Sequence, residues 1–150
     1  MYTVSKIVNI DGTTFDSIYE SNKTQLVQNI GYDDIDNLRR TFEDTVGVEK
    51  IFFQAVDDND NVVAYFAGLP EGNTAFMYNM VTKTTDTLAQ TVESSASILK
   101  SLGYTHVDFC VKDGTATQTY CKNSMNRPEL YEYLSERDFG DYKRVSLRLI

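Results

Sequence analysis

The residues best suited to bind an anion lie where a predicted strand runs into a predicted helix. Strand-forming residues occupy Thr74–Thr82, and the capping box Thr87-Leu88-Ala89-Gln90 starts a helix soon afterwards. A helix N-terminus presents unpaired backbone N–H groups and the positive end of the helix dipole, which together stabilise a negative charge. The sequence therefore predicts an anionic ligand at this junction.

Nucleophiles are sparse in this chain. His106 is the only histidine, so a zinc site with two histidines and a Ser-His-Asp triad have little support. Cys110 and Cys121 are predicted to be free thiols, because a chain with an adequate core seldom needs a disulfide. Cys110 falls in a predicted buried strand and Cys121 in a more accessible predicted loop, so a cysteine nucleophile stays open as an alternative.

The acidic segment of residues 57–61 partly matches the sequence of a calcium-binding loop. Asp57, Asn59 and Asn61 match the first ligands of a calcium loop. Val62 stands where that loop needs glycine, and Gly68 stands where it needs a glutamate. The segment is therefore predicted to be a turn, and no metal site is expected.

Composition narrows the class of protein. The 150 residues fit one domain, and no apolar run approaches the roughly 20 residues of a membrane span. The N-terminus lacks an export signal, so a cytoplasmic protein without a membrane partner is expected. The net charge of −8 and the scattered 14 Lys and Arg argue against nucleic acid. An acidic surface suits a cationic amine, and it also serves solubility alone.

The first half of the chain predicts a strand, two helices and a meander. The first strand covers residues 2–8, and helical spacing of apolar residues follows over 13–30 and 33–46. Two strands, Ile51–Val56 and residues 62–67, flank the acidic turn as a hairpin, and Thr74–Thr82 extends it.

The second half predicts a crossover and a closing strand. A helix over 87–102 ends at Gly103 and leads to a strand over 104–112, expected to lie parallel to Thr74–Thr82. Residues 113–126 read as an irregular polar loop. The capping box Asn126-Arg127-Pro128-Glu129 predicts a last helix over 126–139, and a strand over 143–150 ends the chain.

The order of these elements, β-α-α-β-β-β-α-β-α-β, resembles that of the GNAT acetyltransferase superfamily over nearly the whole chain. The residues that carry the resemblance are the meander of 51–81, the crossover of 87–112 and the ending of 126–139, which looks like the family's asparagine, helix, tyrosine and glycine-phenylalanine pattern. The resemblance implies a single α+β (α/β) domain with a mixed sheet.

The resemblance also implies acetyl-CoA as cofactor. In the family, the pantetheine arm pairs with the strand before the crossover helix, where the sheet splays, and the pyrophosphate binds the helix N-terminus. By this likeness Lys83 adds a positive charge, and the family's usual loop glycines are absent here. The implied cofactor-binding residues are Asn79, Met80, Val81, Lys83, Thr84, Thr85, Thr87, Leu88 and Asn126.

Many family members use a tyrosine on the last helix to return a proton to the leaving thiolate. Leu134 occupies that place here, so the resemblance points to the neighbouring Tyr133 and Tyr131 as catalytic candidates. A general base has no signature of its own, and Glu71, Asp108 and Tyr78 are candidates near the cleft.

Two functions remain open at this point. The first is an acyl-CoA-dependent N-acyltransferase that moves an acetyl group to an unidentified small-molecule or peptide amine. The second keeps the fold without the chemistry, as a binding or assembly module such as a virion-associated or structural protein. A homodimer is left open in either case.

Overall fold

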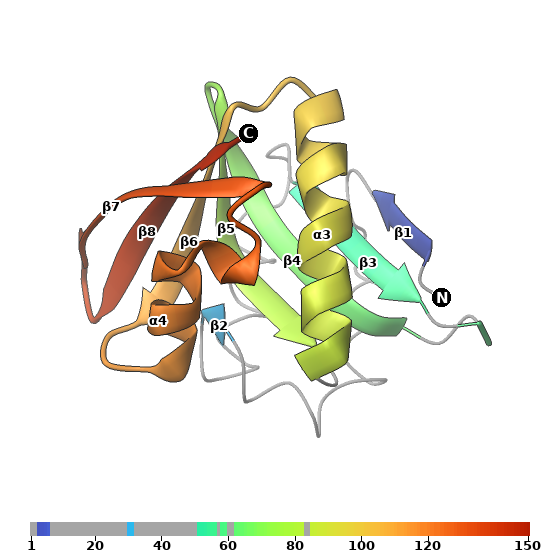
Figure 1. The fold of residues 1–150 in the computed structure, drawn as a ribbon, viewed down its shortest axis with the longest axis horizontal. Helices are drawn as coiled ribbons and strands as arrows, with labels where there is room; N and C mark the ends of the chain where they lie inside the picture. Colours follow the sequence, from blue (N-terminus) through green and yellow to red (C-terminus); the bar gives the residue numbers. More distant parts are fainter. Residues whose placement is uncertain (1–2, 7–29, 32–50, 57, 60–61, 83–84) are drawn as a thin grey trace.

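The computed structural model describes residues 3–6, 30–31, 51–56, 58–59, 62–82 and 85–150. The helix predicted over 33–46 lies outside these residues, as does the one predicted over 13–30 except for Ile30, which belongs to a short strand. The elements in chain order are β1 (Thr3–Lys6), β2 (Ile30–Gly31), β3 (Ile51–Val56), β4 (Val62–Glu71), β5 (Thr74–Thr82), α3 (Thr85–Ser101), β6 (His106–Lys112), α4 (Ala116–Lys122), the 3-10 turn η2 (Ser124–Asn126), β7 (Tyr131–Phe139) and β8 (Tyr142–Leu149) (Figure 1).

The strands form one mixed sheet in the order β1-β3-β4-β5-β6-β8-β7, and β2 pairs with β5 off this path. The pairing between β5 and β6 is parallel, as predicted, and the other pairs are antiparallel. The helix α3 makes the crossover that a parallel pair requires. The predicted α+β fold with a mixed sheet is therefore confirmed.

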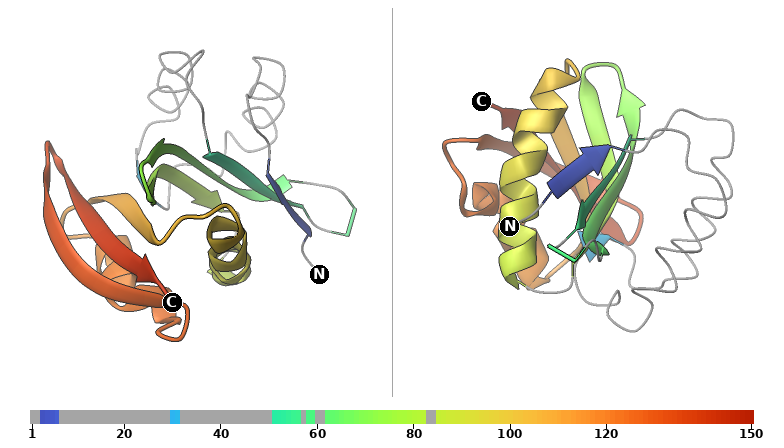
Figure 2. Two further views of the ribbon diagram at one scale, coloured as in Figure 1. Left: turned by 90° about the horizontal axis from the view of Figure 1, so that it is seen from above. Right: turned by 90° about the vertical axis from the view of Figure 1, so that its right-hand side faces the viewer.

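The helices α3 and α4 lie on the same face of the sheet (Figures 1 and 2). The inner stripe of α3 is fully buried and consists mostly of small residues, which let the helix approach the strands closely. Its members are Thr91, Val92, Ser95, Ala96 and Leu99. Ser95 donates its hydroxyl hydrogen to the carbonyl of Thr91 at 2.6 Å, so its burial leaves no hydroxyl donor unsatisfied.

The hairpin of β4 and β5 turns through Gly72-Asn73. Glu71 pairs with Thr74, and Gly72 has a φ of 61°, which glycine adopts without a steric cost. This tight turn carries β4 on to Glu71, four residues beyond the end predicted from sequence.

The C-terminal third corrects the sequence prediction. Residues 131–139 form the strand β7, and the helix predicted there is wrong. The capping box fails because Asn126 has a φ of 57°, whereas an N-cap residue needs an extended backbone. Gly140, at a φ of 62°, joins β7 to β8 in a tight hairpin, and this long antiparallel pairing outweighs the local helical pattern.

The helix of this region lies in the segment predicted to be irregular. Thr115 is the N-cap of α4, and its hydroxyl oxygen accepts the backbone N–H of Gln118 at 3.3 Å. The Gln118 side chain reaches back to accept the backbone N–H of Gly114 at 2.7 Å. The side chains of Thr115 and Gln118 thus hold the start of the short helix.

Candidate functional site

The sheet forks between β5 and β6. Their pairing runs from Thr74 opposite His106 to Met77 opposite Phe109 and stops there. Beyond this point β5 continues to Thr82 paired with β4, while β6 continues to Lys112 paired with β8. The two strands therefore part before Met80 and Val81, as the sequence analysis expected.

A short strand already occupies part of the fork. In β2, Ile30 pairs with Met80 and Gly31 pairs with Asn79. The backbone edge expected to receive the pantetheine arm is therefore paired within the chain at Asn79 and Met80, and the β2 pairing stops short of Val81.

The crossover helix begins at the open end of the fork. Its first residue, Thr85, follows the end of β5 by three positions, and Thr87 and Leu88 lie in the same first turn. Lys83 and Thr84 lie outside the described residues. The first N–H groups of a helix have no partner within the helix, so this turn is the part of α3 suited to an anion.

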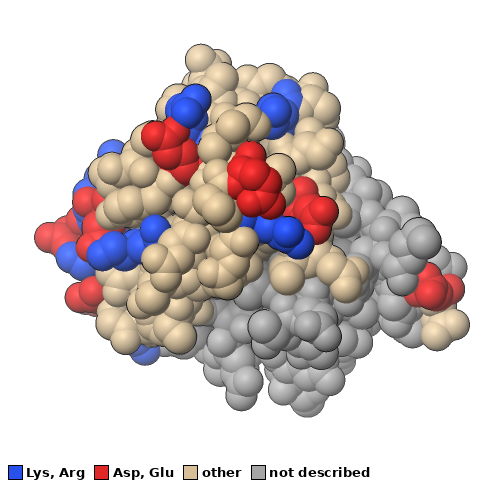
Figure 3. All heavy atoms as spheres, in the orientation of Figure 1, with Lys and Arg blue, Asp and Glu red and all other residues tan. Residues whose placement is uncertain are grey.

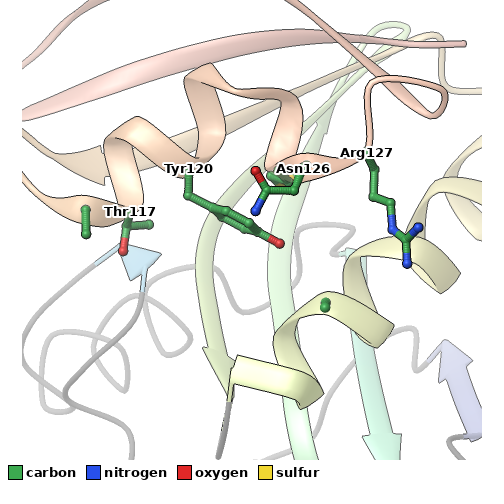
Figure 4. A pocket seen from close by; sticks show the side chains of 7 residues that line it. Thr117, Tyr120, Asn126 and Arg127 are labelled. Carbon is green, nitrogen blue, oxygen red and sulfur yellow. The ribbon is translucent and has the colours of Figure 1, made fainter.

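A pocket of about 470 Å³ lies between α3, α4 and the turn that follows α4 (Figure 4). This volume is within the range of ligand-binding pockets in proteins. Its wall is mostly apolar, and four of the described residues that line it have polar side chains. The lining residues are Ala89, Ala116, Thr117, Tyr120, Met125, Asn126 and Arg127.

Tyr120 is the tyrosine that α4 carries, and its ring reaches from α4 into the space facing α3 (Figure 4). Burial raises the pKa of its hydroxyl, the adjacent Cys121 raises it further, and the positive charge of Arg127 lowers it. The phenol therefore remains protonated at neutral pH and can donate a proton within the pocket.

Tyr120 is not among the site residues predicted from sequence, although a signal for its helix is present. Thr115 and Gln118 have the spacing of a capping box, which marks the helix on which Tyr120 lies. The capping box that begins at Asn126 is the more conspicuous one, and it predicts the last helix over 126–139. That helix would follow the pocket, whereas α4 lies beside it.

Asn126, expected from sequence to contact the cofactor, does line the pocket. It ends a left-handed turn in which Ser124, Met125 and Asn126 have φ angles of 58°, 53° and 57°. Each such residue costs roughly 1–2 kcal/mol relative to a right-handed conformation. The turn buries Met125 and directs the Asn126 side chain toward Tyr120 (Figure 4).

The two tyrosines chosen from sequence lie elsewhere, on β7. Tyr131 is 1% exposed and donates its hydroxyl hydrogen to the carbonyl of Val92 at 2.8 Å, and burial raises its pKa far above the usual range. Tyr133 is half-buried and packs against the core. Neither side chain lines the pocket between α3 and α4.

The base candidates Glu71 and Asp108 are both held by Arg144. The buried Arg144 donates from Nε to Asp108 at 2.6 Å and from Nη2 to Glu71, and it lies over the Phe76 ring at 4.0 Å. These contacts place the two carboxylates in an ion-pair cluster.

Both thiols are buried, so the prediction of an accessible Cys121 is wrong: Cys121 lies on the inner side of α4, fully covered. In the described part of the chain, no group of three or more His, Cys, Asp or Glu side chains could hold a metal, and no helix is long and apolar enough to cross a membrane.

Comparison with known proteins identifies the fold. No protein-family model and no curated protein sequence matches this chain. Among solved structures, the ribosomal-protein-S18-alanine N-acetyltransferase from Escherichia coli is 15% identical, with a TM-score of 0.63 over 99% of this chain and 93% of that one.

Two further structures give the same result. The aminoglycoside 6'-acetyltransferase type Ii is 13% identical, with a TM-score of 0.65 over 97% of this chain and 95% of that one. A mutant form of the spermidine/spermine N-acetyltransferase SpeG from Vibrio cholerae is 10% identical, with a TM-score of 0.60 over 100% of this chain and 94% of that one. The fold of this chain is that of the GNAT N-acetyltransferases.

Proposed function

We propose that this protein is a GNAT-type N-acetyltransferase that moves an acetyl group from acetyl-CoA to an amine. The observation that carries the proposal is the placement of Tyr120 in a pocket of about 470 Å³ next to the first turns of α3. A protonated phenol can protonate a leaving thiolate, and a helix start beside it suits the phosphates of a thioester cofactor. The likeness to acetyltransferases of known fold supports this choice of reaction.

The residues present fit acetyl-CoA in most respects. The first turn of α3, at Thr85, Thr87 and Leu88, would hold the pyrophosphate by its amides, with Lys83 and Thr84 before it, and Asn126 would hydrogen-bond the arm. When bound, acetyl-CoA supplies an acetyl group activated as a thioester. The arm would run along Val81 and, where β2 is displaced, along Asn79 and Met80.

In this scheme Tyr120 acts as the general acid. Its hydroxyl donates a proton to the sulfur as the thiol leaves, and the proton lost by the attacking amine returns to the phenol through solvent. The acceptor is a neutral amine at the moment of attack, and the net charge of −8 attracts its protonated form from solution. A cytoplasmic location remains part of the proposal.

One observation favours the alternative of a non-catalytic module. The pairing of β2 with Asn79 and Met80 fills the edge that the arm would use. A catalytic protein must therefore exchange this pairing for the cofactor, whereas a binding module keeps it.

A thermal-shift titration with acetyl-CoA distinguishes the two functions. A ligand present at a hundred times its Kd stabilises the fold by ~2.7 kcal/mol, which raises the melting temperature by several degrees. Desulfo-CoA serves as a control that binds without reacting. An unchanged melting temperature at millimolar acetyl-CoA would rule out the enzyme and leave the module.

The role of Tyr120 is tested by Tyr120→Phe, with Tyr133→Phe as the matched control. We expect Tyr120→Phe to lower kcat on the order of 100-fold with an unchanged Kd for acetyl-CoA, because the ring stays and the proton donor is lost. Tyr133→Phe is expected to leave kcat unchanged. The reverse pattern would place the acid on β7.

A further inference from the structure

The pocket between α3 and α4 carries a single charged side chain among the described residues that line it. Arg127 supplies that charge, while Thr117, Tyr120 and Asn126 supply neutral polar groups. An anion that enters this pocket therefore meets the cation of Arg127 among the described residues of its wall (Figure 4).

The backbone of Arg127 is fixed on both sides. Its N–H donates to the carbonyl of Ser124 at 2.9 Å, at the end of the left-handed turn. Its own carbonyl accepts the N–H groups of Leu130 and Tyr131, both at 3.0 Å, at the start of β7. The backbone of Arg127 is therefore tied on both sides, while its side chain extends beyond these bonds.

The present partners of this guanidinium are exchangeable. Nη2 lies 3.0 Å from Oε2 of Glu93, and Nη1 lies 3.6 Å from Oε1 of Glu129. The side chains of Arg127, Glu93 and Glu129 are 40%, 57% and 58% exposed, and exposed pairs contribute about 0–1 kcal/mol. A phosphate accepts two parallel hydrogen bonds from the same fork with greater strength.

The sequence of the loop before α3 leaves room for a further cation. The protein carries a net charge of −8, and the segment from Thr82 to Thr87 has no glycine and balances Lys83 with Asp86. Side chains on every residue limit how closely a phosphate approaches the backbone, and Asp86 adds repulsion. The partial positive charge of about one half at a helix start is small against several phosphate charges.

We propose that Arg127 binds a phosphate group of the cofactor's nucleotide end and releases Glu93 when it does so. The inference rests on the proposed function, because it names a residue that holds the acyl-CoA. It assigns Glu93 the role of a competing anion that occupies the guanidinium in the free protein.

Calorimetric binding of CoA, dephospho-CoA and pantetheine to the wild type, Arg127→Met, Arg127→Lys and Glu93→Gln tests the proposal. We expect Arg127→Met to weaken CoA about tenfold or more, and to leave pantetheine unchanged because it has no phosphate. Arg127→Lys should retain part of the affinity, because it keeps the charge and loses the fork. Glu93→Gln should tighten CoA, because it removes the competitor.

The opposite directions of Arg127→Met and Glu93→Gln separate ligand binding from structure. If the ion pair only braces η2 against α3, the two variants weaken CoA equally, and the proposal is overturned. CoA affinity unchanged in Arg127→Met also overturns it. A loss seen for CoA but not for dephospho-CoA supports the 3'-phosphate as the group bound, and a loss for both supports the pyrophosphate.

Failure of this inference differs from failure of the proposed function. Wild-type protein that binds neither CoA nor dephospho-CoA overturns both. Wild-type protein that binds CoA, with Arg127→Met binding it equally well, overturns the role of Arg127 alone. Far-UV circular dichroism of each variant checks that the fold is retained.

Discussion

At the scale of single residues, two tyrosines of similar chemistry have opposite surroundings. Tyr120 lines a pocket and is partly exposed, whereas Tyr131 is buried and fixed to the backbone of α3. A hydroxyl that is both buried and bonded to a helix carbonyl contributes to stability and does not reach a ligand. The position of the ring therefore separates the two roles.

Tyr131→Phe is expected to lower the free energy of unfolding by about 1 kcal/mol, because it removes one buried hydrogen bond and keeps the ring. Acetyl transfer should proceed at the wild-type kcat. Urea denaturation measures the first effect and steady-state kinetics the second. A normal stability combined with a lowered kcat would return Tyr131 to a catalytic role.

The two thiols predict how stability depends on pH. Burial raises the pKa of Cys110 to about 11, with Arg144 opposing it, and raises the pKa of Cys121 to about 12. The ordinary pKa of a cysteine thiol is 9.0, and the unfolded chain has this value. Above pH 9.0 the unfolded chain therefore loses the thiol protons, while the folded chain keeps them. The unfolded state then binds fewer protons, and stability falls as pH rises.

We therefore expect the contribution of these thiols to the free energy of unfolding to be constant well below pH 9 and to decline from there toward pH 11 for Cys110 and pH 12 for Cys121. Urea denaturation at a series of pH values measures the decline, which Cys110→Ala combined with Cys121→Ala should reduce. Ellman's reagent at pH 8 should label the thiols only after unfolding. Rapid labelling of native protein would contradict their burial.

At the scale of elements, α4 is short and depends on its first turn. The seven-residue helix carries Tyr120, and Thr115 caps it: its hydroxyl accepts from the backbone N–H of Gln118 and donates to the carbonyl of Lys112 at 2.7 Å. A helix of this length is not stable by itself, so the cap and the packing against the sheet hold it.

Thr115→Ala is expected to destabilise the protein by about 1 kcal/mol, because the cap is lost. Thr119→Ala is the matched control, since Thr119 is exposed on the same helix and alanine favours helix. The control should change stability by less than about 0.5 kcal/mol. Equal effects of the two substitutions in chemical denaturation would show that the cap contact does not matter.

At the scale of the whole molecule, the sheet consists of two halves joined at the base of the fork. Four paired positions between β5 and β6 connect β1, β3, β4 and β5 with β6, β8 and β7. Arg144 of β8 adds a side-chain connection, since it binds Glu71 on β4 and Asp108 on β6 across the Phe76 ring of β5. The cluster lies just before the strands part.

Arg144→Met is expected to destabilise the protein by about 3 kcal/mol, because it leaves Asp108, which is 5% exposed, with the more distant guanidinium of the exposed Arg137 at 3.9 Å in place of the Arg144 contact at 2.6 Å. Arg148→Met is the control on the same strand: Arg148 pairs with Glu132 at the surface, where an ion pair contributes about 0–1 kcal/mol. Thermal and urea denaturation compare the two. Equal losses would contradict the special role of the Arg144 cluster.

The face of the molecule shown in Figure 3 carries basic and acidic side chains mixed together. Lys and Arg lie close to Asp and Glu over the face shown in Figure 3, where basic and acidic groups alternate. Such a surface favours solubility and does not present a basic stripe of the kind that tracks nucleic acid. The recognition of a ligand is therefore expected to depend on the pocket, not on this face as a whole.

The sequence alone determined the elements whose signals are local. The strands Ile51–Val56 and Thr74–Thr82 have the bounds predicted from β-branched and aromatic residues, and the stripe of α3 followed from helical spacing. The parallel crossover followed from the order of these elements. The fork, with the start of α3 beside it, was implied by the resemblance to the GNAT superfamily.

Tertiary structure decided the last third and the proposed active side chain. Residues 126–139 carry a helical pattern, yet residues 131–139 pair with β8. This pairing stabilises the fold more than a helix cap would, because it provides hydrogen-bond partners for the backbone along the whole strand. Once β7 forms a strand, the preceding segment is the one that covers the sheet, and Tyr120 rather than Tyr133 reaches the pocket. That choice depends on contacts between distant segments, which no local pattern records.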